Sequence, residues 1–345
     1  GRTLGYFVVD ALLADSGQAA VFTARDFAHG RPAIIKVRYP DERDDQAVAR
    51  FLRKAELAAR LNHPYAAHLY SFGAEPDGVC WIAMEHVHGT PLSTVLVAQP
   101  DGRMPLAQGV ALLDRLAEVV ATAHEQGIVH CDLKPGNVMV QARAGRLVPR
   151  LLDLGIVRCI AELSLVDAGG PVGSPPYMAP EQWRGDALDE RTDLYALAVV
   201  AYEALTGRRP FAGDTLALAR AHAAAAVPPV PADLPAALDA VFARALAKDR
   251  ASRYATALEL AASVRSAAGL STASEALPPL AGAARTQAQW RRIRWPRRSR
   301  RSRRRATRTR RATRPGPWST RSRAGSRSSR WPPAPGSGGA ARWSS

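Results

Sequence analysis

The sequence predicts an α+β fold in which a small antiparallel sheet precedes a mainly helical part. Residues 6–37 alternate short β-branched and aromatic runs with turns, which is typical of a three-stranded antiparallel meander. Apolar residues recur at helical spacing over residues 106–125. Three further helical stretches are expected near residues 215–226, 234–247 and 254–268. The hydrophobic content of 47% is enough to bury a core in this chain of 345 residues.

One helix and one strand are expected between the meander and the long helix. The helix covers about residues 46–61, because the acidic residues that lead it suit a helix N-terminus. The strand covers residues 79–85 and is almost entirely apolar, which indicates burial. A strongly apolar helix is also expected over residues 193–205. No run of about 18 apolar residues occurs and no signal peptide opens the chain, so no transmembrane segment is predicted.

Positive charge is concentrated at the C-terminal end of the sequence. Residues 276–345 contain 20 Arg and no Lys, Asp or Glu, so the total of +16 leaves −4 for residues 1–275. Residues 271–345 are rich in Arg, Ser and Pro and lack periodicity, and we expect them to be disordered because they cannot bury a core. Three interpretations stay open for this tail: an anchor to anionic lipid or nucleic acid, a spacer before a lost receptor segment, and a frameshift artefact.

The three cysteines give no sign of a zinc site or a disulfide framework. Cys80, Cys131 and Cys159 lack C-x-x-C spacing. They favour a reducing compartment. The sequence therefore predicts a cytoplasmic location, with the inner membrane surface as the alternative if the basic tail is an anchor.

Residues 128–137, which spell I-V-H-C-D-L-K-P-G-N, gather three polar side chains in one loop. The Pro-Gly pair forces a turn that a helix would not tolerate. A carboxylate, an ammonium and a carboxamide at this spacing suit phosphoryl transfer. Asp132 is suited to accept a hydroxyl proton, and Lys134 to neutralise charge on the phosphoryl group. Asn137 offers an oxygen to a hard metal such as Mg²⁺.

A second candidate metal ligand follows sixteen residues after Asn137, where an apolar run ends in Asp153-Leu154-Gly155. With this motif in place, the chain resembles a protein kinase, and most closely the bacterial Ser/Thr kinases. Residues 130–137 resemble the family's H-R-D-L-K-P-x-N catalytic loop, and residues 153–155 its D-F-G magnesium motif. Residues 173–181 resemble its G-T/S-P-x-Y-M-A-P-E segment.

The resemblance implies a two-lobed protein kinase fold. The N-lobe, a small antiparallel sheet with one helix, is expected at about residues 4–85. The mainly helical C-lobe is expected at about residues 89–268. The kinase domain would then occupy residues 1–270, ahead of the basic tail.

The resemblance also implies where ATP binds. Lys36, in the segment A-I-I-K-V, stands where the family has the strand lysine that contacts the α and β phosphates. Met84 stands at the position that gates the adenine pocket. The backbone of Glu85 and Val87 is expected to meet the adenine edge. ATP and Mg²⁺, or Mn²⁺, are therefore the expected cofactors.

The loop that would cover the ATP phosphates departs from the family pattern. Leu13, Gly17 and Val21 are expected to line the ATP site, but the family's three glycine positions in this loop hold Ala, Ser and Ala. Backbone N–H groups approach phosphates closely only where no Cβ intervenes. We therefore expect this loop to hold phosphate less well.

The helix at residues 46–61 departs from the pattern as well. In the family it supplies a glutamate that pairs with the strand lysine, but Lys54 stands at that position. Glu56 lies about 200° further around the helix and faces elsewhere. Two cations about 4 Å apart repel by about 4 kcal/mol at an effective dielectric of 20. We therefore expect Lys54 near Lys36, weak ATP affinity, and an outward helix when ATP is absent.

The resemblance implies structural roles for four further residues. Ser174 is expected to bridge Asp132 and Lys134 beneath the substrate. A buried ion pair is expected between Glu181 and Arg253. Asp193 is expected to anchor the backbone of the catalytic loop.

The segment that would form the activation loop, residues 156–172, lacks the usual elements of a phosphorylation switch. Cys131 stands where many family members have an arginine that grips a phosphorylated residue. Ser164 is the only hydroxyl that this segment offers. The sequence therefore predicts a kinase that is not switched by activation-loop phosphorylation.

Together these patterns predict transfer of the γ-phosphoryl group of Mg·ATP to Ser or Thr hydroxyls of protein substrates. The sequence K-P-G-N at residues 134–137 resembles Ser/Thr rather than Tyr kinases. The alternative is a pseudokinase that binds partners or nucleotide with little catalysis, which Lys54 and the missing glycines favour. The groups that touch metal and phosphoryl are all present, whereas the lost groups mainly position ATP, so we favour the enzyme.

Overall fold

The computed structural model describes residues 2–15, 19–39, 45–143, 146–154 and 173–270. The chain divides into two units, Gly1–Ile293 and Arg294–Ser345, and all described residues belong to the first. The expectations for Gly17, Cys159, Ser164 and residues 271–345 lie outside the described residues.

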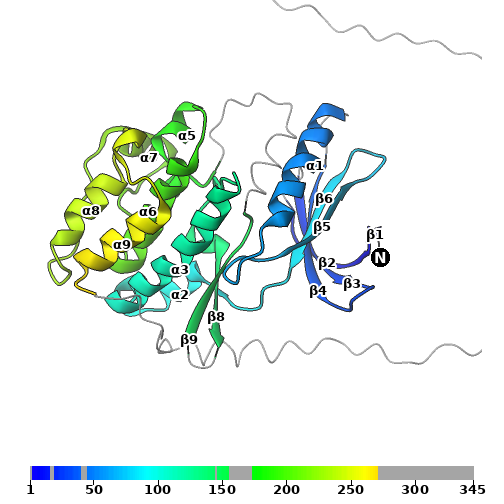
Figure 1. Cartoon of the computed structure of the whole chain (residues 1–345), viewed down its shortest axis with the longest axis horizontal. Coiled ribbons are helices and arrows are strands. Elements are labelled where there is room, and N and C mark those ends of the chain that lie inside the picture. Colours follow the sequence, from blue (N-terminus) through cyan, green and yellow to red (C-terminus); the bar gives the residue numbers. More distant parts are fainter. Residues whose placement is uncertain (1, 16–18, 40–44, 144–145, 155–172, 271–345) are drawn as a thin grey trace, which may run out of the picture. The chain divides into compact units, whose positions relative to one another are not determined.

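The first part of the chain folds into an antiparallel sheet of six strands (Figure 1). The strands run in the spatial order β1-β2-β3-β4-β6-β5. Their bounds are Thr3–Leu4 (β1), Phe7–Asp15 (β2), Ala19–Asp26 (β3), Pro32–Arg38 (β4), Leu69–Ala74 (β5) and Cys80–Glu85 (β6). The predicted meander is confirmed as β2, β3 and β4. Sequence analysis missed β1, which has only two residues, and β5, whose register with β6 is irregular.

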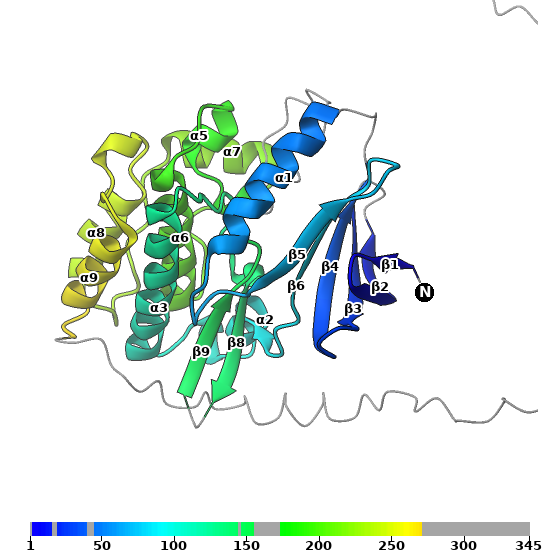
Figure 2. The same cartoon turned by 45° about the vertical axis from the view of Figure 1, so that its right-hand side comes forward.

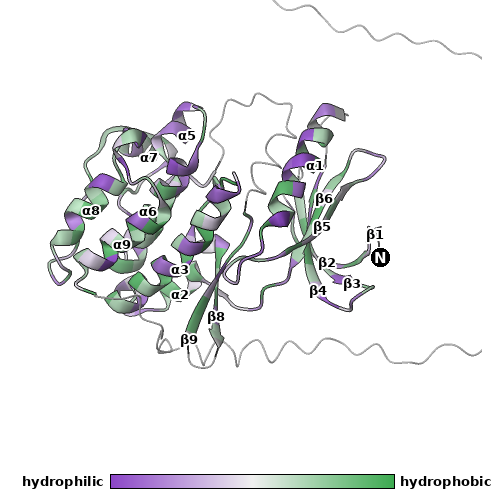
Figure 3. Cartoon of the chain, viewed as in Figure 1, coloured by the Kyte–Doolittle hydropathy of each residue, from purple (hydrophilic) through white to green (hydrophobic). Residues whose placement is uncertain are grey.

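Helix α1 (Asp45–Arg60) packs against β5 on one face of this sheet (Figures 1 and 2). Its buried face carries Phe51, Ala55 and Ala58, which form a cluster with apolar residues of β5 and β6. The rest of the helix is more hydrophilic than the strands beside it (Figure 3). A second cluster includes Ile35 and Trp81. The ring of Trp81 leaves no room for a Cβ at Gly5, which would lie 2.7 Å from it.

The second part of the chain is mainly helical, as predicted. Almost all of helix α6 is buried, and α3 packs against both α6 and α9. The helices are α2 (Leu92–Val97), α3 (Leu106–Glu125), α5 (Pro180–Arg184), α6 (Glu190–Thr206), α7 (Thr215–Ala224), α8 (Ala237–Ala245) and α9 (Ala257–Ala267). The five helices predicted here are confirmed as α3, α6, α7, α8 and α9. Sequence analysis did not predict α2 and α5, which are too short to show a clear period.

A small second sheet combines β7, which follows β6, with β8 and β9, which follow α3. It contains β7 (Thr90–Pro91), β8 (Val138–Arg143) and β9 (Arg146–Leu151) in that order. The loop at residues 128–137 connects α3 to β8, and Asp153 lies two residues after the end of β9. Within the described residues, no helix is both long and apolar enough to cross a membrane.

The buried helix α6 should dominate the stability of the helical part. Leu197 is fully buried on it, and we expect Leu197→Ala to lower the free energy of unfolding by about 2–5 kcal/mol through lost burial and a residual cavity. Leu216→Ala is the matched control, because Leu216 is 60% exposed on α7. Urea unfolding followed by circular dichroism measures both. Equal losses in the two variants would contradict this account of the core.

Candidate active site

Three polar side chains meet at the catalytic loop. Lys134 Nζ lies 2.6 Å from Asp132 Oδ2 and donates to Ser174 Oγ at 2.6 Å. Ser174 Oγ in turn donates to Asp132 Oδ1 at 2.8 Å. The structure therefore brings together Asp132, Lys134 and Ser174, although 42 positions separate Ser174 from Asp132. The Asp132 carboxylate is buried, and each of its oxygens contacts one of the other two side chains of this triangle.

The backbone of the loop is held by Asp193, in the first turn of α6. The N–H of His130 donates to Asp193 Oδ2 at 2.7 Å, and that of Cys131 donates to Oδ1 at 2.8 Å. His124 Nε2, on α3, lies 2.9 Å from Oδ2. Cys131 adopts a left-handed conformation with φ of 65°, which is uncommon for a residue with a Cβ. The Asp193 carboxylate thus fixes the peptide groups that lead into Asp132.

The expected metal ligands lie on adjacent segments. The N–H of Leu152 donates to the carbonyl of Asn137 at 2.8 Å, which sets Asp153 beside Asn137. The Asn137 amide nitrogen donates to the Asp132 carbonyl at 2.8 Å, so its amide oxygen is the atom available to a metal. Asp153 Oδ1 is buried and has no hydrogen-bond partner among the residues that the structure describes.

These donors fit a hard cation, because an unpartnered buried carboxylate oxygen and an amide oxygen are the ligands that Mg²⁺ accepts. Across the described residues, no cluster of three or more His, Cys, Asp or Glu side chains could hold a metal ion. A metal here would therefore depend on Asp153 and Asn137 together with groups of the substrate.

Lys36 lies on β4 and pairs with Asp153. Its Nζ is 2.5 Å from Asp153 Oδ2, a contact that joins the first sheet to the segment after β9. Val21 faces Lys36 across the β3–β4 register. Leu13, near the end of β2, is 57% exposed.

The expected hinge follows β6. Met84 is buried in the sheet core beneath α1. The N–H of Val87 donates to the carbonyl of Glu85 at 3.1 Å, so the two backbone groups expected to meet adenine bond to each other here. The Glu85 side chain pairs with Arg150, on β9, and Arg150 also donates to the carbonyl of Ala66 at 2.7 Å.

Helix α1 brings no carboxylate to Lys36 among the contacts of the described residues. Glu56 is exposed and pairs with Arg60 at 3.0 Å. Lys54 is half-buried, one turn after Phe51 and one turn before Ala58, which are both buried. Its spacing thus puts Lys54 on the inward side of the helix.

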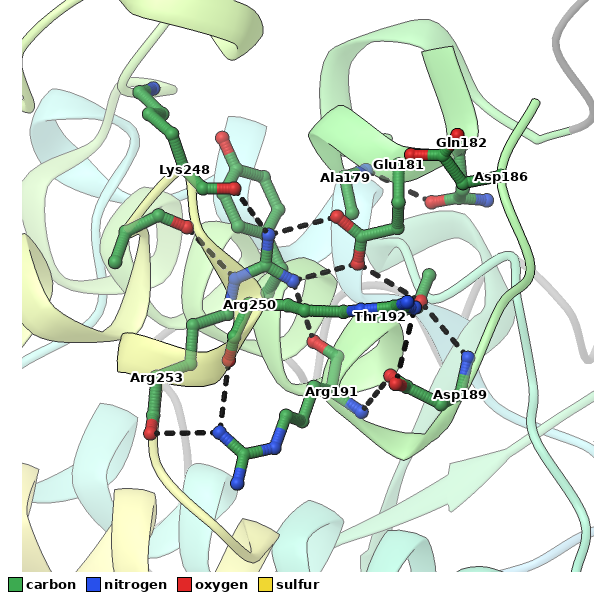
Figure 4. A network of polar contacts seen from close by, with 12 residues as sticks. Ala179, Glu181, Gln182, Asp186, Asp189, Arg191, Thr192, Lys248, Arg250 and Arg253 are labelled. Carbon is green, nitrogen blue, oxygen red and sulfur yellow. Dashed lines mark hydrogen bonds and ion pairs between the residues drawn. The ribbon is translucent and has the colours of Figure 1, made fainter. Parts of the chain in front are cut away.

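A buried ion pair joins Glu181, on α5, to Arg253, in the segment between α8 and α9 (Figure 4). Arg253 NH1 and NH2 donate to Glu181 Oε1 and Oε2 at 2.7 and 2.9 Å. Thr192, next to Asp193 on α6, donates to Glu181 Oε1 at 3.0 Å. Burial acts to raise the pKa of Glu181, but the hydrogen bonds and charge of Arg253 outweigh it and hold that pKa below its ordinary value.

Sequence reasoning missed several residues that hold these groups in place. Thr192 supports Glu181, Arg150 supports the hinge, and His124 supports Asp193. Gln182 joins the catalytic loop to Ala179. The contacts of Arg150 with Glu85, of His124 with Asp193 and of Gln182 with Cys131 join residues far apart in the sequence, so no local motif signals them.

Comparisons with known proteins identify the family of this chain. A model described as "Protein kinase domain" matches residues 9–263. The chain belongs to the protein kinase family. Serine/threonine-protein kinase pkn3 of Myxococcus xanthus is 36% identical over 272 residues, covering 74% of this chain and 49% of that protein. PknA of Mycobacterium tuberculosis is 34% identical over 261 residues, covering 74% of this chain and 59% of that kinase.

Solved structures agree as well. The crystal structure of the Mycobacterium tuberculosis PknI kinase domain matches with a TM-score of 0.60 at 28% identity. The match covers 78% of this chain and 98% of that kinase domain. The two-lobed kinase fold predicted from the sequence is confirmed. This chain spans about half the length or less of several bacterial kinases that it matches: 49% of pkn3, 38% of PknB of Bifidobacterium longum and 41% of PknB of Mycobacterium leprae.

The Glu181–Arg253 pair should make stability depend on pH. Glu181→Gln leaves a buried guanidinium without its counter-charge, and we expect it to lower the free energy of unfolding by about 3–5 kcal/mol at pH 7. Because the folded-state pKa of Glu181 is lowered, its stabilisation is complete above the ordinary value of 4.5 and is lost as the pH falls through the lowered pKa.

Urea unfolding of both proteins between pH 7 and pH 3 measures this difference. Wild type and Glu181→Gln should therefore converge in the acid range. A difference in stability that stays constant down to pH 3 would show that the carboxylate charge is not what stabilises the pair.

Proposed function

We propose that this chain transfers the γ-phosphoryl group of Mg·ATP to serine or threonine hydroxyls of protein substrates. The observation that carries the proposal is the triangle of Asp132, Lys134 and Ser174. Its buried carboxylate lies within 2.6 Å of an ammonium and 2.8 Å of a hydroxyl. Family membership supports the same reaction, and the named relatives are serine/threonine-protein kinases.

The acceptor hydroxyl would meet Asp132, which orients it and accepts its proton as the bond to phosphorus forms. Lys134 contributes positive charge beside the phosphoryl group in transit. Ser174 holds both side chains in one arrangement, so little reorganisation is needed when a substrate arrives.

Mg²⁺, or Mn²⁺, would be held by Asn137 and Asp153. A bound divalent cation supplies positive charge that neutralises the phosphate oxygens. Lys36 would also contact the phosphates, because its Nζ lies beside Asp153, one of the two residues that would hold the metal. Leu13, Val21 and Met84 would surround the nucleotide, and the backbone of Glu85 and Val87 would meet the adenine edge.

The alternative is a pseudokinase that binds nucleotide or a partner with little catalysis. Lys54 and the Cβ-bearing residues of the phosphate loop favour it, because both weaken the hold on ATP. These losses concern the positioning of ATP. The residues that would act on the hydroxyl and the phosphoryl group keep a complete set of contacts, and this favours the enzyme.

We also propose that the kinase needs no phosphate on its activation loop. The site of the usual phosphate-gripping arginine holds Cys131, which is buried and has no charge to offer. The backbone N–H groups of Cys131 and of His130 before it are nevertheless held by Asp193. The activation segment itself, with Ser164, lies outside the described residues.

Contact of the basic tail with anionic lipid or nucleic acid stays a prediction that rests on the charge of residues 276–345 alone. Such contact would weaken steeply with salt, because it would depend on counterion release or surface charge. A cytoplasmic location and the alternative at the inner membrane surface stay predictions in the same way.

Replacing the Asp132 carboxylate should stop phosphoryl transfer and leave nucleotide binding largely intact. We expect Asp132→Ala to abolish transfer to a generic protein acceptor while ATP affinity stays within a few-fold, because the carboxylate acts on the hydroxyl. Phosphate transfer from labelled Mg·ATP measures the first quantity, and calorimetric titration with ATP the second. Loss of ATP binding with unchanged turnover would contradict the assignment of Asp132.

Restoring an acid on α1 should improve catalysis. We expect Lys54→Glu to raise kcat/KM by roughly tenfold, if pairing with Lys36 recovers about 1.4 kcal/mol of transition-state positioning. Arg53→Glu is the matched control, because it makes the same change of charge at the adjacent exposed position. Steady-state kinetics at varied ATP measure both variants. A fall in activity for Lys54→Glu would mean that Lys54 itself holds phosphate.

A further inference from the structure

Gln182, the third residue of α5, connects the catalytic loop to the substrate loop, by which we mean residues 173–179. Its side chain is 5% exposed. The amide nitrogen donates to the carbonyl of Cys131 at 2.9 Å, and the amide oxygen accepts from the N–H of Ala179 at 2.9 Å. We call this pair of contacts the Gln182 bridge. Figure 4 shows its Ala179 side.

On the catalytic side, the bridge completes the restraint of Cys131. The N–H of Cys131 is held by Asp193 at 2.8 Å, and its carbonyl is held by Gln182. That carbonyl belongs to the peptide bond that leads into Asp132. Because a peptide group is planar, fixing the carbonyl also fixes the direction in which the chain enters Asp132. The left-handed φ of 65° at Cys131 is a conformation that persists only when its surroundings impose it.

On the substrate side, the bridge holds the loop that carries Ser174. Gly173 has φ of 133°, and a Cβ there would lie 3.0 Å from the Gln182 amide nitrogen and 3.4 Å from the Cys131 carbonyl oxygen. The backbone at residue 173 therefore passes directly over the bridge. One residue later, Ser174 donates to Asp132 at 2.8 Å.

We propose that Gln182 is a positioning residue that aligns Asp132 with the substrate loop. Two neutral hydrogen bonds of its side chain join the carbonyl of Cys131 to the N–H of Ala179. The arrangement needs no added phosphate, because both partners of the bridge are backbone groups. This inference rests on the proposed kinase function and extends it to how the active geometry is maintained.

A purely structural role would be to cap α5, since a glutamine at this position commonly bonds the N–H that precedes a helix. Gln182→Glu separates the two roles. It keeps an oxygen for the Ala179 N–H but removes the donor to Cys131 and sets a negative charge against that carbonyl. Gln182→Met removes both contacts at similar volume. Gln99→Glu, beyond the end of α2, is the control for the change of charge.

The experiment measures transfer from Mg·ATP to a generic protein acceptor by the full-length chain between pH 6 and pH 8. We expect both Gln182 variants to lower kcat by roughly tenfold, with the KM for ATP within about twofold of wild type. Burial raises the pKa of the introduced carboxyl, so acid should protonate it and restore a donor. Relative to wild type at each pH, Gln182→Glu should therefore recover as the pH falls, whereas Gln182→Met should not.

Unchanged kcat in both variants would overturn the proposal. A kcat of Gln182→Glu that stays the same fraction of the wild-type kcat at every pH would overturn it as well. Amide hydrogen exchange of residues 128–137 provides a readout that needs no activity. We expect faster exchange there in Gln182→Met than in wild type, and equal exchange would also overturn the proposal. An inactive wild type would contradict the proposed function instead, and hydrogen exchange would still decide the bridge.

Discussion

The geometry of the site depends on one buried carboxylate. Asp193 is 1% exposed, and a charge at such a position is costly unless donors surround it. The available donors are the backbone N–H groups of His130 and Cys131, with the ring of His124 beside them. Satisfying the carboxylate therefore forces the loop into the strained turn at Cys131, and this turn directs Asp132 toward Ser174. The folding free energy of the helical core maintains the strain.

Helix α6 also holds α5, the helix that follows the substrate loop. Thr192 and Asp193 are neighbours in its first turn, and one supports Glu181 while the other supports the catalytic loop. Because α6 is buried over most of its length, its first turn has little freedom to move. The catalytic loop and α5 are therefore both held by the first turn of α6, and Gln182 adds a direct contact between them.

Sequence reasoning could predict what short motifs encode. Asp132, Lys134 and Asn137 fall within six residues, and the spacing alone indicated their chemistry. The long helices were predictable from their period. The ion pair between Glu85 and Arg150 and the Gln182–Cys131 contact join residues 65 and 51 positions apart. Neither has a local pattern, because tertiary packing alone brings the partners together. The short strand β1 and helix α5 were missed because a few residues cannot establish a period.

The proposed nucleotide site and the proposed transfer site rest on different contacts, and this bears on the choice between kinase and pseudokinase. Lys36 pairs with Asp153, and the N–H of Val87 donates to the carbonyl of Glu85. In the proposed site ATP would replace these contacts, so each new hydrogen bond would contribute only its net value of about 0.5–1.5 kcal/mol. Lys54 and the Cβ-bearing residues of the proposed phosphate loop would reduce that gain further. None of these features touches the contacts among Asp132, Lys134 and Ser174, which are anchored through Asp193. Weak nucleotide affinity and an intact transfer site are therefore compatible in this chain.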